Sequence, residues 1–321
     1  SKNPFQLFIS YQKLKKFIDD EQIDLINPHR SEGFPLFVFA TFAARSKKPE
    51  KPIAIVRTRG TTRILRNHWL NRKMNTDWTD YHITAGEIIS QRLMSKVPRI
   101  NNKIKTIYFP ADCSKFHNKL EKNFHEEFEI PENHRVISVV GRIRPVKGQR
   151  VLLKVFNELL SEFTDLILLI PYRDTSEKED EMIALREDLN RLNIKDNVRL
   201  IPEREDILQI MEFTSLGIVS SIDSEVICRV AMEFFSVGTP VVAFPTGCLP
   251  EIIRHRQNGM LAKNKTLEAL LIEIRNVLSN PKLLDRISQG ALKDAEVRFD
   301  PKIMLDKTLE VYRSALSTRR Q

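Results

Sequence analysis

Residues 135–160 read RVISVVGRIRPVKGQRVLLKVFNELL, which predicts a buried strand, a turn that contains Gly141 and Gly148, and then a helix. A strand that leads through such a turn into a helix is the repeating unit of parallel α/β sheets. The start of the helix offers unpaired N–H groups and a partial positive charge, which favour phosphate. Arg142 and Lys147 flank the turn, so this pair could neutralise a diphosphate; a solvated basic turn is the alternative.

The same alternation of short β-branched runs and amphipathic helical patterns continues along the chain. It predicts an α/β fold with parallel sheets. The predicted strands lie at residues 23–26, 53–57, 81–84, 105–109, 136–140, 166–170, 198–201, 216–220 and 240–244. A polar, irregular segment at residues 110–131 marks the expected domain boundary. After Gly259 we expect no further strand, only three helices separated at Asn280-Pro281 and Asp300-Pro301.

Composition excludes several classes of protein. The 321 residues suffice for two domains, and 41% hydrophobic with 29% charged residues is typical of globular proteins. No apolar run approaches the roughly 20 residues of a membrane-spanning helix, and the start lacks the pattern of a signal peptide, so we expect a cytoplasmic protein. Cys113, Cys228, Cys248 and the seven histidines lack metal-ligand spacing, so no metal site is expected.

The net charge of +9 predicts an anionic partner. Nucleic acid, an acidic membrane surface and phosphorylated small molecules all fit that charge. The chain has no RNP-type aromatic repeat, zinc-finger spacing or basic-region heptad, so we expect no nucleic-acid binding.

Residues 224–240 read SEVICRVAMEFFSVGTP and contain two carboxylates, Glu225 and Glu233, eight positions apart. Ordinary helix electrostatics offers one explanation, in which Glu225 is an acid near a helix start and Glu233 is exposed. However, Val226 and Ile227 are β-branched and suit a loop. We therefore expect Glu225 on a loop at the carboxyl edge of the sheet and Glu233 inside the helix, both directed at one ligand.

This stretch resembles the donor-site signature of glycosyltransferase family 4, the retaining, nucleotide-sugar-dependent enzymes of the GT-B fold. Glu225 and Glu233 match the two glutamates of the family's E-x7-E motif. The continuation EFFSVGTPVVAFPTGCLPEII is similar to the family's E-A-M-A-x-G-x-P-V-V-A and G-G-x-x-E-I. Likewise GRIRPVKG resembles G-R-L-x-x-x-K-G, and PADCSKF resembles the interdomain landmark G-V-D-x-x-x-F.

The resemblance implies a role for each matched residue. Arg142 and Lys147, beside Gly141, would hold the donor diphosphate, Glu233 the ribose hydroxyls and Glu225 the donor sugar; Arg142, Lys147 and Glu225 are the catalytic candidates. The further donor-binding candidates are Cys228, Arg229 and Val230 at the helix start, and Arg204 in the loop that packs on the nucleotide base in the family.

One departure from the family lies beside Glu225. Where the family commonly has E-G-F-G, this chain has Glu225-Val226-Ile227-Cys228, so bulky side chains replace glycines whose backbone would approach the sugar. We therefore expect the donor-sugar preference to differ from that of typical family members.

The acceptor-side candidates are His29, Arg59 and Arg63. Arg59 stands where the family often has a histidine in T-x-H-G. Because an arginine with an ordinary pKa above 12 is not a general base at neutral pH, this position is expected to bind an anion, and a solvated basic helix is the alternative. The predicted acceptor is therefore an anionic glycan or lipid-linked saccharide.

The resemblance implies a GT-B architecture, with two Rossmann-like domains that face a cleft. We expect a partial acceptor-side domain at residues 1–118, a donor-binding domain at residues 119–300, and a C-terminal helix at residues 301–321 that crosses back to the first domain. The first domain is expected to be incomplete, because the chain opens on a helix and on the order of 60 residues of the family pattern are missing.

The implied function is retaining transfer of a sugar from a UDP-, GDP- or ADP-linked donor in the synthesis of cell-envelope polysaccharide or lipopolysaccharide. We expect no required cofactor, and the basic surface is compatible with peripheral contact at the inner face of the membrane. Two alternatives remain open: a nucleotide-sugar 2-epimerase of the same fold, and a catalytically idle nucleotide-sugar-binding protein.

Overall fold

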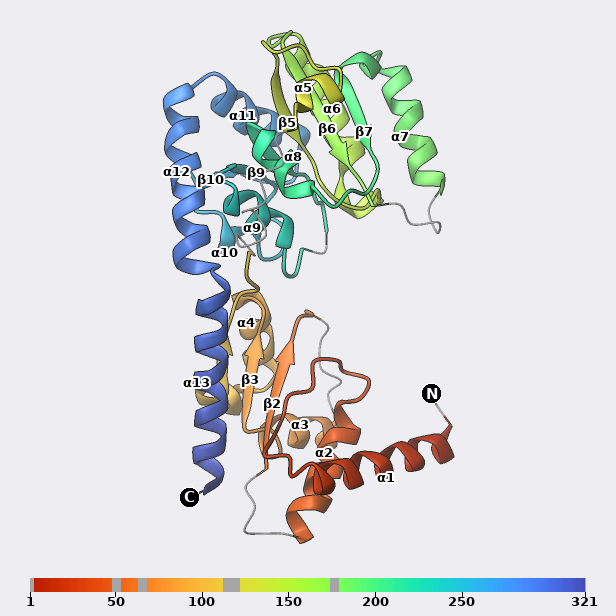
Figure 1. Cartoon of the computed structure of the whole chain (residues 1–321), viewed down its shortest axis with the longest axis vertical. Coiled ribbons are helices and arrows are strands. Elements are labelled where there is room, and N and C mark those ends of the chain that lie inside the picture. The colour runs from red at the N-terminus through yellow and green to blue at the C-terminus, as the bar shows by residue number, and fades with distance from the viewer. Residues whose placement is uncertain are drawn as a thin grey trace. The chain divides into compact units, whose positions relative to one another are not determined.

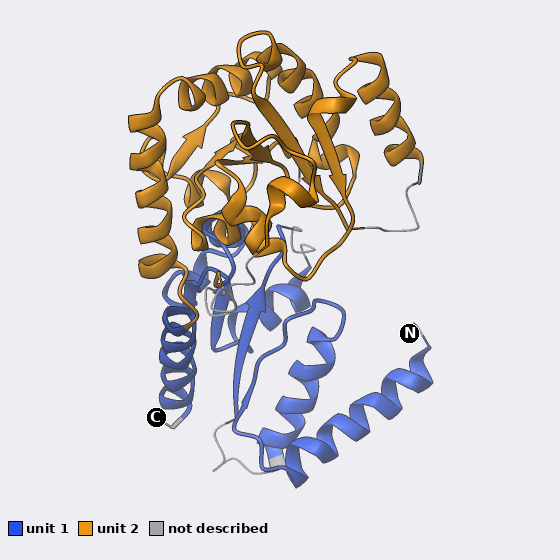
Figure 2. Ribbon diagram, turned by 45° about the horizontal axis from the view of Figure 1, so that its top comes forward, with its two compact units in different colours: residues 1–109, 302–321 blue, residues 110–301 orange. Residues whose placement is uncertain are grey.

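The computed structural model describes residues 3–47, 53–62, 68–111, 122–173, 179–223 and 225–320 (Figure 1). Figure 2 shows the chain divided into two compact units: unit 1 comprises residues 1–109 and 302–321, and unit 2 comprises residues 110–301. The domain boundary predicted after residue 118, most of the PADCSKF landmark and Cys113 lie outside the described residues.

Unit 1 is built on a four-stranded parallel sheet in the order β1-β2-β3-β4. Its strands are β1 (Leu25–Ile26), β2 (Ala54–Arg59), β3 (Tyr81–Thr84) and β4 (Ile104–Thr106). Its helices are α1 (Pro4–Asp20), α2 (Phe34–Lys47), α3 (Trp69–Thr76), α4 (Glu87–Lys96), the short 3-10 helix η1 (Pro98–Lys103) and α13 (Pro301–Arg320).

Helix α13 belongs to the core of unit 1 although it is last in sequence. Its Val311 and Ala315 are buried in one hydrophobic cluster with residues of β2 and β3. Arg319 also forms an ion pair with the buried Asp80 at 2.6 Å. The C-terminal helix is thereby fixed to the sheet of unit 1 by apolar and charged contacts.

Unit 2 contains a six-stranded parallel sheet in the order β10-β9-β8-β5-β6-β7. Its strands are β5 (Arg135–Ser138), β6 (Leu166–Pro171), β7 (Val198–Ile201), β8 (Leu216–Val219), β9 (Val241–Ala243) and β10 (Gly259–Leu261). Along β6, Leu168 packs in one buried cluster, whereas Ile167 and Leu169 pack in another. Both faces of the sheet are therefore covered, which explains why this strand is apolar throughout.

The remaining elements of unit 2 connect these strands. They are α5 (Phe124–Glu127), η3 (Pro145–Lys147), α6 (Gln149–Leu160), α7 (Glu179–Arg191), η4 (Lys195–Asn197), α8 (Ile207–Phe213), α9 (Arg229–Ser236), α10 (Leu249–Ile252), α11 (Leu267–Leu278) and α12 (Pro281–Arg298). In the part of the chain that the structure describes, no helix has the length and apolar composition needed to cross a membrane.

The structure confirms the predicted strands, with small shifts at their ends, and the three C-terminal helices. The prediction that no strand follows Asn258-Gly259 is wrong, because β10 pairs in parallel with β9 and Gly259 lies opposite Val241. A Cβ on Gly259 would lie 2.4 Å from the Val241 carbonyl oxygen, so glycine permits this pairing. A three-residue strand that begins with glycine is too short to show an apolar pattern.

Candidate functional site

The strand order of unit 2 reverses between β5 and β8. From this central pair the chain extends through β6 and β7 on one side and through β9 and β10 on the other. In open parallel sheets, ligands bind beyond the carboxyl ends of the strands at such a reversal point. Val139 and Val140 follow β5 at this edge, and Ser220 and Ser221 follow β8.

Gly148 lets the turn after β5 dock on the loop after β8. Its φ of +69° lies in the left-handed region, and a Cβ there would be 2.1 Å from the Ser220 carbonyl oxygen. The Ser220 hydroxyl also donates to the Lys147 carbonyl oxygen at 3.0 Å. The main chain at Lys147 is thereby fixed against the end of β8.

A second glycine supports Glu225 in a similar way. Gly247 has a φ of +58°, and a Cβ at this position would lie 1.8 Å from the Glu225 carbonyl oxygen. The same oxygen accepts a hydrogen bond from the Cys248 N–H at 2.7 Å. The loop after β9 thus fixes the backbone of Glu225, which lies between β8 and α9 outside any helix.

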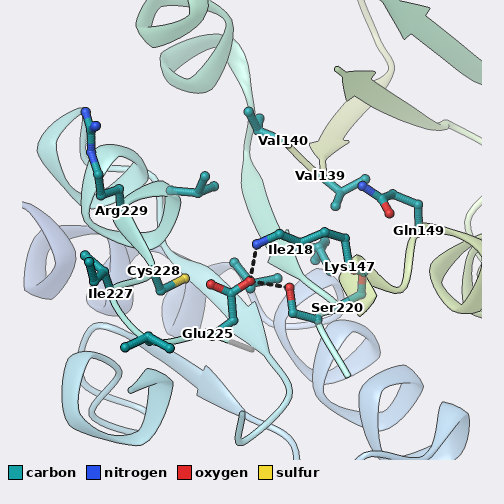
Figure 3. Close-up of a pocket in the computed structure, with 14 residues that line it drawn as sticks. Val139, Val140, Lys147, Gln149, Ile218, Ser220, Glu225, Ile227, Cys228 and Arg229 are labelled. Atoms are coloured by element: carbon teal, nitrogen blue, oxygen red, sulfur yellow. Dashed lines mark hydrogen bonds and ion pairs between the residues drawn. The ribbon is translucent and has the colours of Figure 1, made fainter. Parts of the chain in front are cut away.

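The side chains of Lys147 and Glu225 form an ion pair at the switch point (Figure 3). The Glu225 side chain is only 6% exposed, and that of Lys147 is 27% exposed. The Ser221 hydroxyl donates to the same carboxylate at 2.5 Å. A buried carboxylate is costly unless it is paired and hydrogen-bonded, and these two donors meet that need.

Two cavities share Lys147 in their walls. The inner cavity, of about 350 Å³, contains Glu225, Gln149, Ser221 and the apolar side chains of Val226 and Ile227 in its lining. The outer cavity, of about 480 Å³, is lined by the predicted donor-binding residues Gly141, Arg142, Arg204 and Glu233, and by Tyr172 and Pro202. Val140, Arg229 and Val230 line both.

The start of α9 lies between Glu225 and Glu233. Cys228 precedes the helix with a φ of +39°, and its thiol contacts the Ala231 N–H as a weak acceptor rather than as an ordinary cap. Burial raises the pKa of the Cys228 thiol well above its usual value, so this side chain is neutral near pH 7. Arg229, with a side chain 68% exposed, pairs with Glu233 one turn later at 3.2 Å.

Arg142, in the turn after β5, and Arg204, in the loop expected to pack on the nucleotide base, make different contacts. Arg142 is exposed, and its carbonyl oxygen accepts a hydrogen bond from Gln149 at 2.9 Å. The Arg204 guanidinium instead contacts Asp206 through two bonds of 2.7 Å and also pairs with Glu127. These carboxylates raise the pKa of Arg204 and tie its side chain into the loop.

The acceptor-side candidates belong to unit 1. Arg59 ends β2 and is 5% exposed, and burial lowers its pKa. His29 is exposed on the loop after β1, which is the strand next to β2. Arg63 lies outside the described residues. The structure therefore places Arg59 at the end of β2 and His29 after β1, the neighbouring parallel strand of the same sheet.

Sequence reasoning missed Ser220 and Ser221, which contact Lys147 and Glu225 respectively. A signal was present in the sequence: two consecutive hydroxyl residues stand at the carboxyl end of a predicted apolar strand, Ser220 as its last residue and Ser221 directly after it. It also missed Arg57, which is 4% exposed and stacks on Phe34 with 3.8 Å between the guanidinium carbon and the ring centroid.

Among the described residues, no group of His, Cys, Asp and Glu forms a metal site.

Residues 121–294 match the model of the family described as Glycosyl transferases group 1. Because the match covers more than half of the 321 residues, the chain belongs to this family of transferases.

The chain is similar in sequence to curated relatives. Spore coat protein SA of Bacillus subtilis is 23% identical over 242 residues, which cover 72% of this chain and 64% of the relative. A D-inositol 3-phosphate glycosyltransferase of a Nocardioides species is 25% identical over 254 residues, which cover 75% of this chain and 55% of the relative. The chain thus spans less than two thirds of the length of these relatives.

Solved glycosyltransferase structures share the fold. A glycosyltransferase from Rickettsia africae superposes with a TM-score of 0.87 at 21% identity, covering 98% of this chain and 83% of that protein. HepE of Anabaena, crystallised with UDP, superposes with a TM-score of 0.78 at 20% identity, covering 95% of this chain and 82% of that protein. The chain therefore has the α/β GT-B fold.

Proposed function

We propose that this chain is a retaining transferase of glycosyltransferase family 4, which moves a sugar from a nucleotide-sugar donor to a glycan or lipid-linked acceptor. The observation that carries the proposal is the buried Lys147–Glu225 ion pair at the switch point of the sheet. Glu233 lines the adjoining outer cavity, and Lys147 lines both cavities, so each carboxylate of the E-x7-E motif shares a cavity wall with Lys147.

The two cavities suggest how the donor lies. The diphosphate binds at Lys147, Arg142 and the first N–H groups of α9, because that is where positive charge and backbone donors converge. The ribose hydroxyls donate to Glu233, and the base extends toward the loop that Arg204 holds. The sugar then occupies the inner cavity beside Glu225.

The charges support a reaction without a side-chain base. The acceptor oxygen attacks the anomeric carbon on the face from which the diphosphate departs. The breaking C–O bond leaves its electron pair on the diphosphate, which takes the acceptor's proton. Lys147, Arg142 and the N–H groups of α9 stabilise the growing negative charge, so the proposed reaction uses no metal.

Unit 1 supports an anionic acceptor. Arg57 donates to Asn75 at 2.5 Å and to Ser31 at 3.3 Å, both neutral groups. Among the described residues, no carboxylate forms an ion pair with Arg57. Burial is the larger cause that lowers the pKa of Arg57 to about 9, and the neighbouring Arg59 adds to the effect. A negatively charged acceptor would offset the buried charge of Arg57, with Arg59, His29 and Arg63 as further acceptor-side residues.

An envelope role is part of the same proposal. A relative carries the name D-inositol 3-phosphate glycosyltransferase, which is compatible with a phosphorylated acceptor. The net charge of +9 would favour peripheral contact with an acidic membrane surface, where lipid-linked saccharides are found.

A thermal-shift screen with UDP-, GDP-, ADP- and CMP-sugars tests the proposal. A ligand at 100 times its Kd adds about 2.7 kcal/mol to the free energy of unfolding, so one donor class should raise the melting temperature clearly. Lys147→Ala should lose this shift. Lys154→Ala, which removes an exposed lysine of α6, should keep it.

The screen, followed by analysis of the products formed from the selected donor, also separates the alternative functions. If no nucleotide sugar stabilises the chain, the proposed function is wrong. Formation of an epimer from the donor alone would identify a 2-epimerase. Donor binding without transfer or slow hydrolysis would identify a binding protein.

A further inference from the structure

Two consecutive buried serines after β8 each hold one half of the Lys147–Glu225 pair. Ser220 donates from its hydroxyl to the Lys147 carbonyl oxygen at 3.0 Å, and Ser221 donates to the Glu225 carboxylate at 2.5 Å. The two residues are 0% and 2% exposed. Their hydroxyls therefore set the position of a cation and an anion that are 78 residues apart in sequence.

The two donors to Glu225 use the same carboxylate oxygen. The Lys147 ammonium and the Ser221 hydroxyl both contact Oε1. Within the described ranges, no residue donates to Oε2. Figure 3 shows this second oxygen on the side of the carboxylate that is turned away from Lys147, beside Cys228.

We propose that Ser221 is a positioning residue, which keeps Oε1 occupied so that Oε2 of Glu225 accepts a hydrogen bond from a hydroxyl of the donor sugar. The proposal rests on the proposed function, because it assumes that the inner cavity holds the sugar. A carboxylate with one free oxygen of fixed direction selects one hydroxyl, whereas a rotating carboxylate does not.

The backbone around Ser221 is fixed as well. Its carbonyl oxygen accepts a hydrogen bond from the Thr246 hydroxyl at 2.6 Å. Glu225 is held four residues later by the Cys248 N–H. With both backbones anchored, rotation of the Glu225 side chain is the main freedom that remains, and the Ser221 hydroxyl limits that rotation.

The consequence is a difference between binding and turnover. Ser221 lies in the wall of the inner cavity but not in that of the outer cavity, which is assigned to the nucleotide. Loss of its hydroxyl should therefore lower turnover of the nucleotide sugar, while affinity for the bare nucleoside diphosphate stays the same.

The test compares Ser221→Ala, Ser221→Thr and Thr214→Val in the full chain. Thr214→Val is a matched control, because it removes another buried hydroxyl, which bonds Ser138 and Ile210 and lines neither cavity. For each variant we measure the Kd of UDP, the kcat and KM with UDP-glucose, and the melting temperature. If the screen selects a GDP- or ADP-linked donor, the corresponding GDP or ADP compounds replace UDP and UDP-glucose.

We expect Ser221→Ala to lower kcat/KM by about ten- to a hundredfold, as for loss of a hydrogen bond to a charged group, with the Kd of the nucleotide changed by less than about twofold. Ser221→Thr, which keeps a hydroxyl, should recover part of the loss, and Thr214→Val should keep the kinetics.

Several results would overturn the inference. An unchanged kcat/KM in Ser221→Ala contradicts it, as does an equal loss of nucleotide affinity, which would indicate a general disturbance of the site. If Thr214→Val lost as much turnover, reduced stability would explain the effect instead. Failure of the wild-type chain to bind any nucleotide sugar would overturn the proposed function and this inference with it.

Discussion

Gly148 and Ser220 approach so closely that a methyl group on Gly148 would lie 2.1 Å from the Ser220 carbonyl oxygen. This contact joins the turn after β5 to the end of β8, the two strands that flank the switch point. The geometry of the site therefore depends on the absence of one side chain.

Replacing Gly148 by alanine should destabilise unit 2 and weaken donor binding. The φ of +69° alone costs an alanine on the order of 1 kcal/mol, and the collision with the Ser220 backbone adds to this cost. Gly238→Ala is the matched control, because Gly238 has a φ of +78° but no atom within 4 Å of its added Cβ. Urea denaturation should show a clearly larger loss for Gly148→Ala, and equal losses would contradict the role of the contact.

Glu233 should determine the preference for ribose. If its carboxylate accepts from the ribose hydroxyls, the wild-type chain should bind the nucleoside diphosphate that the screen selects about tenfold or more better than the 2′-deoxy analogue. Glu233→Ala should abolish this preference. Calorimetry on both nucleotides measures it directly.

Arg229→Ala tests whether the ribose preference depends on the Glu233 carboxylate itself or on its ion pair with Arg229. The Arg229 side chain is 68% exposed, so this variant should change the free energy of unfolding by less than about 1 kcal/mol and keep the ribose preference. If Arg229→Ala lost the preference as fully as Glu233→Ala, the ion pair rather than the carboxylate would be responsible.

Cys228 should limit the size of the donor sugar. Its φ of +39° suits glycine, and its buried thiol lines the inner cavity. Cys228→Gly should relax the backbone and raise kcat/KM for bulkier donor sugars relative to the preferred one. Cys248→Ala, which removes a second buried thiol, should leave the ratio of kcat/KM values unchanged. If Cys228→Gly and Cys248→Ala gave the same ratio of kcat/KM values, Cys228 would not limit the size of the donor sugar.

His82 should make unit 1 sensitive to acid. Burial is the largest cause that lowers its pKa from 6.5 to about 3, and Arg57 and Arg59 add to the effect. Between these two pH values the unfolded chain binds more protons than the folded one, so the free energy of unfolding falls as the pH falls. The slope from this one group is up to about 1.4 kcal/mol per pH unit.

Melting temperatures from pH 7 to pH 4 test the role of His82. In His82→Gln the loss on acidification should be smaller than in the wild-type chain. His134→Gln, which alters a histidine bonded to Asn133 at the surface, should retain the wild-type slope. Parallel curves for all three proteins would contradict the prediction.

The strands and the position of Glu225 could be predicted because they depend on local sequence. The apolar run of β6 is buried on both faces, and the β-branched Val226 and Ile227 indicated a loop before α9. In contrast, the Lys147–Glu225 pair joins residues 78 positions apart, and Arg204 pairs with Glu127 at a similar separation. No local pattern predicts such contacts.

The motif resemblance named the charged residues of the site but not what holds them. Ser221 belongs to no motif that was recognised, and Thr246 lies within the matched stretch without a role assigned to it, yet both fix the loop that carries Glu225. β10 was missed because its pairing depends on the close approach of Gly259 to Val241, a tertiary contact.

The Lys147–Glu225 pair has a consequence for the end of a catalytic cycle. When a nucleoside diphosphate leaves the site, the ammonium that balanced it is not stranded in a partly buried wall, because the Glu225 carboxylate serves as its counter-ion. Lys147 then needs no replacement anion from solvent when the product is released. The carboxylate that we propose to contact the sugar would thus also lower the barrier to the next turnover.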